Sequence, residues 1–183
     1  MGFSLFGKKD KTSGAPVFTD RIYMSSAAKM NACLTLAKDQ PGMVFICWFP
    51  DTLKKFTEFF AGHACDVKLV DAHQVHGAMV NDKTVIFTEH HPLRSKEKDL
   101  VNNWQQKEFI VFSGLDEPLF ARFGSEKIIS LMQKMGMKED EMVQHTMVSK
   151  AISNAQEKIA AKLTVEQSAG SQAEWMSRNT SAN

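Results

Sequence analysis

Two short runs of apolar residues, 43–49 and 109–112, constrain the fold of this 183-residue chain more than any other feature. Such runs are typical of strands that are buried on both faces. Further strands are predicted over 17–23, 67–70 and 85–88, and helical patterns follow several of the strands. Strands that alternate with helices predict a three-layer α/β domain with a mainly parallel sheet. The run over 109–112 is expected to be an interior strand.

Polar residues mark where the helices are expected to begin. Ser25 or Ser26, Asp51 and Ser125 are the predicted N-caps of three helices, because a short side-chain oxygen accepts a hydrogen bond from the first turn. Another helix is predicted over 95–105. The spacing therefore places a helix after most of the strands.

A C-terminal amphipathic helix is predicted to begin near Thr146. Its apolar residues recur at helical spacing and its polar residues are expected to face solvent. The apolar set is Val148, Ile152, Ala155 and Ile159, and the polar set is Lys150, Asn154, Gln156 and Lys158. The apolar stripe predicts that this helix packs on another part of the fold.

The chain is expected to contain one α/β domain, over 17–162. Residues 1–16 mix Gly, Lys, Ser and Asp and predict a flexible N-terminal arm. The alternative is a short peptide that docks on a partner through Phe3 and Phe6. Residues 163–183 are expected to form a short helix or an extended tail, because Thr164-x-x-Gln167 resembles a capping box.

Composition excludes several classes of function. The net charge of +1 provides no basic face for nucleic acid. The longest apolar run is much shorter than the roughly 18 residues of a membrane span, so no integral membrane segment is expected. No signal-peptide pattern is visible, and we expect a cytoplasmic protein.

The cysteines and histidines give no sign of a metal site. Cys33, Cys47 and Cys65 are odd in number and show no C-x-x-C spacing, so they are expected to be reduced, buried thiols. His73 and His76 lie in a polar loop without a placed carboxylate. No bound metal is predicted.

Several phrases within residues 84–162 stand in one order. They are Thr-Glu-His-His at 88–91 with Arg94 and Ser95, residues 113–120 with Phe123, Lys-Met-Gly-Met at 134–137, acidic residues at 139–141, and Ser-Lys-Ala-Ile at 149–152 with Ala155, Gln156 and Lys158. This order resembles the end of the second motor domain of SecA, the bacterial preprotein translocase ATPase. The corresponding sequence motifs of that family are T-E-R-H-E-S-R-R, S-x-x-D-x-L-x-x-x-F, K-x-G-M and T-K-A-I-x-x-A-Q-x-K. Here His90 stands in place of an arginine, and Pro92-Leu93 interrupt the first phrase.

The resemblance implies a RecA-like, helicase C-terminal-like fold but not the family's ATPase chemistry. The sequence contains no G-x-x-x-x-G-K-[ST] and no G-x-G-x-x-G phrase, so the groups that hold a triphosphate are missing. The family's N-M-A-G-R-G-T-D and Q-L-R-G-R-x-G-R-Q-G-D phrases, whose arginines neutralise the leaving phosphate, are missing too. No arginine lies between Leu100 and Phe109. We therefore expect neither ATPase activity nor a cofactor.

Ligands of open α/β sheets bind at the carboxyl ends of the strands. The candidate residues at these positions are Asp51, Asp71, Glu89, His91 and Ser113. Glu89 and His91 would share one side of a strand and suit proton transfer, whereas His90 would point away. The simpler interpretations are that Asp51 caps a helix and that Asp71 holds a turn.

Three functions follow from these observations. The first is a non-catalytic SecA-like protein-interaction module, whose predicted partner surface is Lys150, Asn154 and Lys158 and whose partner is a translocase component or a second copy. The simpler alternative is that this helix only covers its own sheet. The second function is half of a nucleotide site that a Walker-type ATPase completes. The third is a small hydrolase that uses Glu89 and His91.

Overall fold

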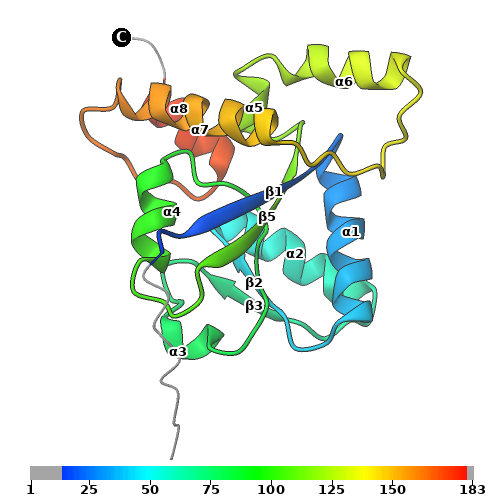
Figure 1. The fold of residues 1–183 in the computed structure, drawn as a ribbon, viewed down its shortest axis with the longest axis vertical. Helices are drawn as coiled ribbons and strands as arrows, with labels where there is room; N and C mark the ends of the chain where they lie inside the picture. The colour runs from blue at the N-terminus through cyan, green and yellow to red at the C-terminus, as the bar shows by residue number, and fades with distance from the viewer. Residues whose placement is uncertain (1–13, 181–183) are drawn as a thin grey trace, which may run out of the picture.

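The computed structural model describes residues 14–180 (Figure 1). Most of the arm predicted over 1–16 therefore lies outside the described residues. The centre of the fold is a five-stranded sheet in which every neighbouring pair is parallel. Its strands are β1 (Val17–Tyr23), β2 (Val44–Cys47), β3 (Lys68–Asp71), β4 (Val85–Phe87) and β5 (Glu108–Gly114), in the order β1-β5-β4-β2-β3. The predicted α/β class is confirmed, and β5 is an interior strand as expected.

Successive residues of the inner strands enter two different cores, which explains why the apolar runs do not alternate with polar residues. In β2, Val44 and Ile46 pack into the core on one face, and Phe45 and Cys47 pack into the core on the other. All four side chains are at most 1 % exposed. Helices therefore cover both faces of the sheet, as in a three-layer fold.

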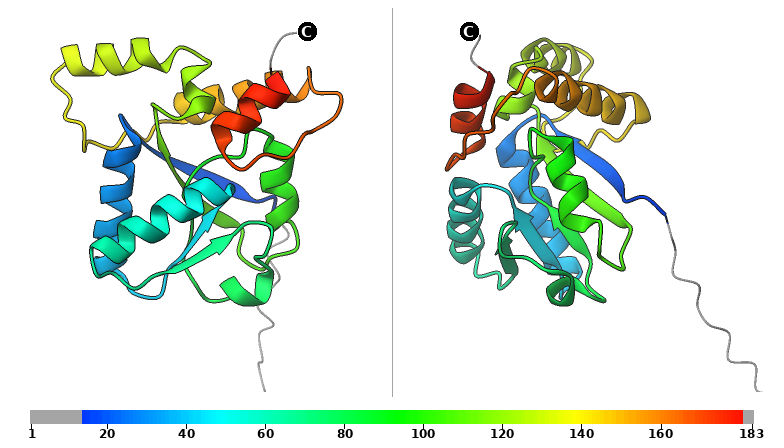
Figure 2. Two further views of the ribbon diagram at one scale, coloured as in Figure 1. Left: turned by 180° about the vertical axis from the view of Figure 1, so that it is seen from behind. Right: turned by 90° about the vertical axis from the view of Figure 1, so that its left-hand side faces the viewer.

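The helices divide into three groups. One core is covered by α1 (Ser26–Asp39) and α2 (Pro50–Gly62), and the other includes residues of α3 (Gly77–Val80) and α4 (Arg94–Val101). The remaining helices, α5 (Pro118–Ala121), α6 (Ser125–Lys134), α7 (Thr146–Ala160) and α8 (Gln172–Thr180), gather beyond the carboxyl ends of the strands (Figures 1 and 2). Within residues 14–180, no helix is long and apolar enough to cross a membrane.

Two of the predicted N-caps are wrong. Phe49 is the N-cap residue of α2, and Asp51 lies inside the first turn, where its carboxylate forms an ion pair with Lys55 at 2.8 Å. Pro50 explains the shift, because its fixed φ and missing N–H suit the first helical position. Ser125 is the first residue of α6 and follows Gly124, which adopts φ +81°. The cap at Ser25 is confirmed, since its Oγ accepts from the Ala28 N–H.

Two helices differ in extent from the prediction. The helix predicted over 95–105 ends at Val101, and the chain then turns so that Trp104 packs edge-on against Phe109. The capping box at Thr164 is not used. The last helix begins at Gln172, after Ser171 accepts a hydrogen bond from the Glu174 N–H.

Gln156 was predicted to face solvent, and this is wrong. Its side chain is fully buried, and Nε2 donates to the His91 carbonyl oxygen at 2.7 Å. The predicted apolar stripe of α7 is otherwise confirmed, because Ile152, Ala155 and Ile159 are buried. One amide on the inner face of α7 therefore joins this helix to the loop after β4.

Gly114 ends β5 at a point where no side chain fits. A Cβ atom there would lie 2.6 Å from the Ser26 backbone nitrogen and 2.6 Å from an Asp116 carboxylate oxygen. These two groups are hydrogen-bonded to each other at 2.7 Å. The close approach of β5 to the start of α1 therefore requires glycine.

We expect Gly114→Ala to lower the free energy of unfolding by about 1–3 kcal/mol, because the backbone around Ser26 must shift. Urea unfolding measures the change. Gly62→Ala, at the end of α2, is the matched control, since a Cβ atom added at Gly62 would have no neighbouring atom within 4 Å. An equal loss in both variants would contradict the steric explanation.

Candidate functional site

A cleft at the carboxyl ends of the inner strands brings together two of the predicted site residues. It has a volume of about 260 Å³ and is lined by residues of α1, α2 and α8, and by the loops after β4 and β5. Asp51 and Glu89 are among the lining residues, together with Lys29, Asp116 and Glu117. We call this the carboxyl-edge cleft.

Lys29 projects from α1 into the base of the cleft. Its side chain is 3 % exposed, and Nζ donates to Glu117 Oε1 at 2.5 Å and to the Thr88 carbonyl oxygen at 2.6 Å. Burial opposes the charge on Lys29, but the Glu117 and Glu89 carboxylates outweigh it and raise the pKa of the ammonium group. Lys29 and Glu117 therefore form a buried ion pair.

Glu89 holds the start of α2. One carboxylate oxygen accepts from the backbone N–H groups of Trp48 and Phe49 at 3.2 and 3.3 Å, and the other accepts from Thr52 Oγ1 at 2.8 Å. Burial raises the pKa of Glu89 to about 7, although the Lys29 charge opposes the shift. Glu89 is therefore a carboxyl group that can gain or lose a proton near neutral pH.

Two buried oxygen atoms at this edge have no hydrogen-bond partner among the described residues. They are Glu117 Oε2 and Ser113 Oγ. Glu117 Oε1 accepts from the Gly114 N–H as well as from Lys29. The polar groups at the end of β5 are thus only partly satisfied.

His90 forms a second polar cluster, on the other side of the same loop. Its Nε2 lies 2.8 Å from Asp20 Oδ1, and its Nδ1 lies 2.8 Å from Glu97 Oε1. All three side chains are at most 6 % exposed. Burial opposes protonation, but the Glu97 and Asp20 carboxylates raise the pKa of His90 to about 10. The ring is therefore a buried imidazolium that donates from both nitrogen atoms.

His91 has the opposite protonation state. Its ring packs against Trp48, Phe49 and Trp175, and its Nδ1 accepts from the Leu93 N–H at 3.0 Å. Burial lowers the pKa of His91 to about 4, so the ring is neutral at pH 7. Glu89 and His91 are each held by their own partners, and the cleft is lined by Glu89 but not by His91.

Asp71 lies at the end of the edge strand β3 and is not part of the cleft lining. Its carboxylate accepts from the His73 N–H at 2.7 Å and contacts the His73 ring at 2.8 Å. In the part of the chain that the structure describes, no group of three or more His, Cys, Asp or Glu side chains is arranged to hold a metal ion.

Sequence reasoning missed Lys29 and Glu117. Lys29 lies four residues before Cys33 and so on the same face of α1, and Cys33 is fully buried in the core that α1 covers. A lysine on the apolar face of a helix needs a buried partner, and this was the available signal. Glu117 lies in the loop that follows the end of β5 at Gly114, but nothing in the neighbouring sequence shows that its side chain faces α1.

The parallel sheet with helices on both faces and a cleft at its carboxyl edge is consistent with a three-layer RecA-like fold.

No protein-family model matches the chain. Part of it is similar to the protein translocase subunit SecA of several bacteria. The identity is 35 % over 103 residues with the subunit of Clostridium beijerinckii and 30 % over 103 residues with that of Chlorobium phaeobacteroides, covering 54 % of this chain in both cases.

A shorter match to SecA of Acidithiobacillus ferrooxidans reaches 47 % identity over 51 residues, or 28 % of this chain. The matches cover 12, 10 and 6 % of these three relatives. The chain thus contains a SecA-like region over about half its length and spans a small part of the relatives it matches.

Proposed function

We propose that this chain is a non-catalytic homologue of the second SecA motor domain and acts in the cytoplasm as a protein-interaction module linked to protein translocation. The observation that carries the proposal is the similarity to SecA over 54 % of the chain at 30–35 % identity. The phrases of the sequence that resemble the motor domain fall in the packing and junction elements, and the phosphate-binding phrases of that family have no counterpart in the sequence.

The charge of the carboxyl-edge cleft supports a non-catalytic role. Its lining includes four carboxyl groups, on Asp51, Glu89, Asp116 and Glu117, against the ammonium groups of Lys29 and Lys55. Glu117 already neutralises Lys29, and Asp51 pairs with Lys55. The negative charges of a triphosphate would therefore be repelled by the carboxylates of the cleft, because neither lysine of the lining is left unpaired. Phosphoryl transfer depends on cations that contact the phosphate groups.

The outer face of α7 supports the choice of partner surface. Lys150, Asn154 and Lys158 are exposed along one row of the helix, while its inner face packs on the fold. One face of the helix therefore packs on the fold, against β1 and α4, and the other face is free for a partner. A translocase component is the partner that we propose, in line with the names of the relatives.

The proposal predicts measurable binding to purified SecA translocase subunit from the same cells. In biolayer interferometry, Lys150→Glu/Asn154→Glu is expected to weaken binding at least about tenfold, because a charge reversal at an interface creates repulsion. The control is Lys38→Glu/Lys98→Glu, two exposed positions on α1 and α4. Unchanged binding in the α7 variant would remove this surface from the proposal.

The same preparation separates the alternatives. ATP hydrolysis by the purified chain alone would contradict the non-catalytic role. ATP binding that appears only after a Walker-type ATPase is added would replace it with a shared nucleotide site. A hydrolase activity lost in both Glu89→Gln and His91→Ala would favour the third function, for which the pKa of Glu89, raised to about 7 by burial, is the supporting observation.

A further inference from the structure

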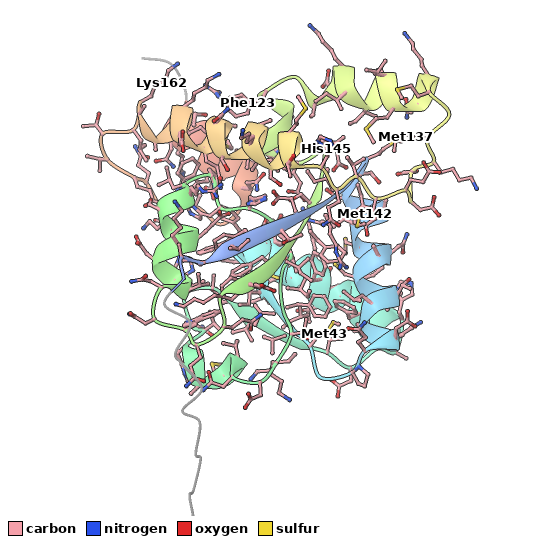
Figure 3. The ribbon with its side chains drawn as sticks, viewed as in Figure 1. Met43, Phe123, Met137, Met142, His145 and Lys162 are labelled. Carbon is pink, nitrogen blue, oxygen red and sulfur yellow. The ribbon has the colours of Figure 1, made fainter. Side chains whose placement is uncertain are left out.

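A groove beside the C-terminal end of α7 combines positive charge with an apolar floor. It has a volume of about 800 Å³ and is formed by the end of α5, the last turn of α7, the loop that follows it, and the end of α8. Figure 3 shows Phe123 and Lys162 on the side of α7 that faces away from the sheet. We call this the α7–α8 groove. Its volume lies within the range of ligand-binding pockets.

The charged residues that line the α7–α8 groove all carry the same sign. They are Arg122, Lys158, Lys162 and Arg178, and no carboxylate is among the lining residues. Arg178 forms an ion pair with Glu174 at 2.6 Å, and Arg122 donates to the Thr180 carbonyl oxygen. Within residues 14–180, the Lys158 and Lys162 ammonium groups have neither an ion pair nor a hydrogen bond. These two cations are available to an anionic partner.

The floor of the groove is apolar. Ile159 is 5 % exposed, and Leu163 is half-buried in the core that lies below. Phe123 and Val165 stand at the rim, with 43 % and 75 % of their surface exposed. A bound side chain would therefore meet an apolar surface beneath a cationic rim.

This shape favours a peptide over a membrane surface. The apolar floor is recessed between α7 and α8, so a flat layer of lipid headgroups would meet the cationic rim without reaching Ile159. A side chain on an extended segment can enter the groove, while acidic neighbours on the same segment reach the two lysines. Charge complementarity across an interface selects such a segment.

We propose that the α7–α8 groove binds an acidic peptide segment of a partner protein, with one aliphatic or aromatic side chain over Ile159 and Leu163 and carboxylates at Lys158 and Lys162. The inference rests on the proposed interaction function, since it names the chemistry of the partner. Lys158 belongs both to this groove and to the partner surface predicted on α7.

Fluorescence anisotropy with labelled synthetic peptides tests the groove directly, using the full chain. The probe is a leucine flanked by two acidic residues on each side, and its comparators replace the leucine by glycine or the acidic residues by lysine. We expect the probe to bind at least tenfold more tightly than either comparator, with an affinity that falls as salt is raised.

Lys158→Glu/Lys162→Glu is expected to reduce the affinity for the probe at least tenfold, and Leu163→Asn is expected to reduce it severalfold. The control Lys38→Glu/Lys98→Glu makes the same change in net charge elsewhere on the surface. An equal loss in the control would overturn the proposal, because the attraction would then be unspecific.

Two further outcomes are decisive. Binding to vesicles of anionic phospholipid, but not to the probe, would overturn the proposal in favour of a lipid surface. In the second outcome, binding to SecA is lost in Lys150→Glu/Asn154→Glu but is unchanged in Lys158→Glu/Lys162→Glu, and the probe does not compete with it. This would overturn the proposed peptide site in the groove and leave the proposed function intact.

Discussion

Replacement of Lys29 by methionine is expected to lower the free energy of unfolding by about 3–5 kcal/mol, because removal of one partner leaves an uncompensated buried charge. Methionine keeps the length of the side chain but provides no cation. Glu117 is then left with the Gly114 N–H as its remaining donor, and Glu89 loses the positive charge of Lys29 that lowers its pKa. Urea unfolding followed by circular dichroism measures the loss.

A double variant separates the ion pair from the packing of the lysine stem. In Lys29→Met/Glu117→Gln the buried charge is removed, and Oε1 of the new amide still accepts from the Gly114 N–H. The double variant is therefore expected to be more stable than Lys29→Met alone. A loss of less than about 1 kcal/mol in Lys29→Met, as for a surface pair, would show that the ammonium group is not needed for stability.

The pH dependence gives an independent check on Lys29→Met. Burial raises the pKa of Glu89 and the Lys29 ammonium group opposes that shift, so without the ammonium group the pKa of Glu89 rises further in the folded state and its carboxyl group favours the protonated form. A raised folded-state pKa means that stability is lost as the pH rises. The damage from Lys29→Met is therefore expected to be smaller at pH 5 than at pH 8.

The sheet could be predicted from the sequence because its signal is local. Runs such as 43–49 and 109–112 are apolar at every position, since neighbouring residues enter different cores. Ser25 was predicted as a cap for the same kind of reason. Asp51 is not a cap, because α2 already begins at Pro50, two residues earlier than it would after a cap at Asp51.

The polar clusters could not be predicted because their partners are distant in sequence. Lys29 meets Glu117 across 88 residues, and His90 meets Asp20 across 70 residues. Side chains alternate between the two faces of a strand, but this rule does not apply to residues 89–91 because β4 ends at Phe87. These residues lie in a loop, and His90, which the rule predicts to point away from the site, has a carboxylate partner at each ring nitrogen.

His90→Leu is the second substitution with a large expected effect. It leaves the carboxylates of Asp20 and Glu97 buried without the imidazolium between them, and we expect a loss of about 3–5 kcal/mol in the free energy of unfolding. Arg94 and Ser149 also lower the pKa of Asp20, but less than His90 does. His73→Leu is the matched control, because His73 lies at the same 2.8 Å from Asp71 with 74 % of its side chain exposed. Little change is expected there.

The pH dependence of His90 follows from its raised pKa. The pKa is about 10 in the folded state against 6.5 for a free histidine, so the stability from this group is complete below 6.5 and is lost as the pH rises towards 10. From about pH 8 to about pH 9.5, the wild-type protein is expected to lose up to about 1 kcal/mol per pH unit through this group. An NMR titration should find the ring protonated throughout the range from pH 6 to about pH 8.5.

The other groups with shifted pKa values titrate outside the range from about pH 8 to about pH 9.5, or they affect wild type and His90→Leu equally. Glu89, with its pKa raised to about 7 from 4.5, loses its stabilising contribution as the pH rises between these values. His91, lowered to about 4, loses its contribution as the pH falls below 6.5. Burial raises the pKa of Cys33 and Cys47 to about 12, which affects wild type and variant alike. The stability difference between wild type and His90→Leu should therefore shrink as the pH rises from about 6.5 towards 10, and a constant difference would mean that His90 is neutral in the fold.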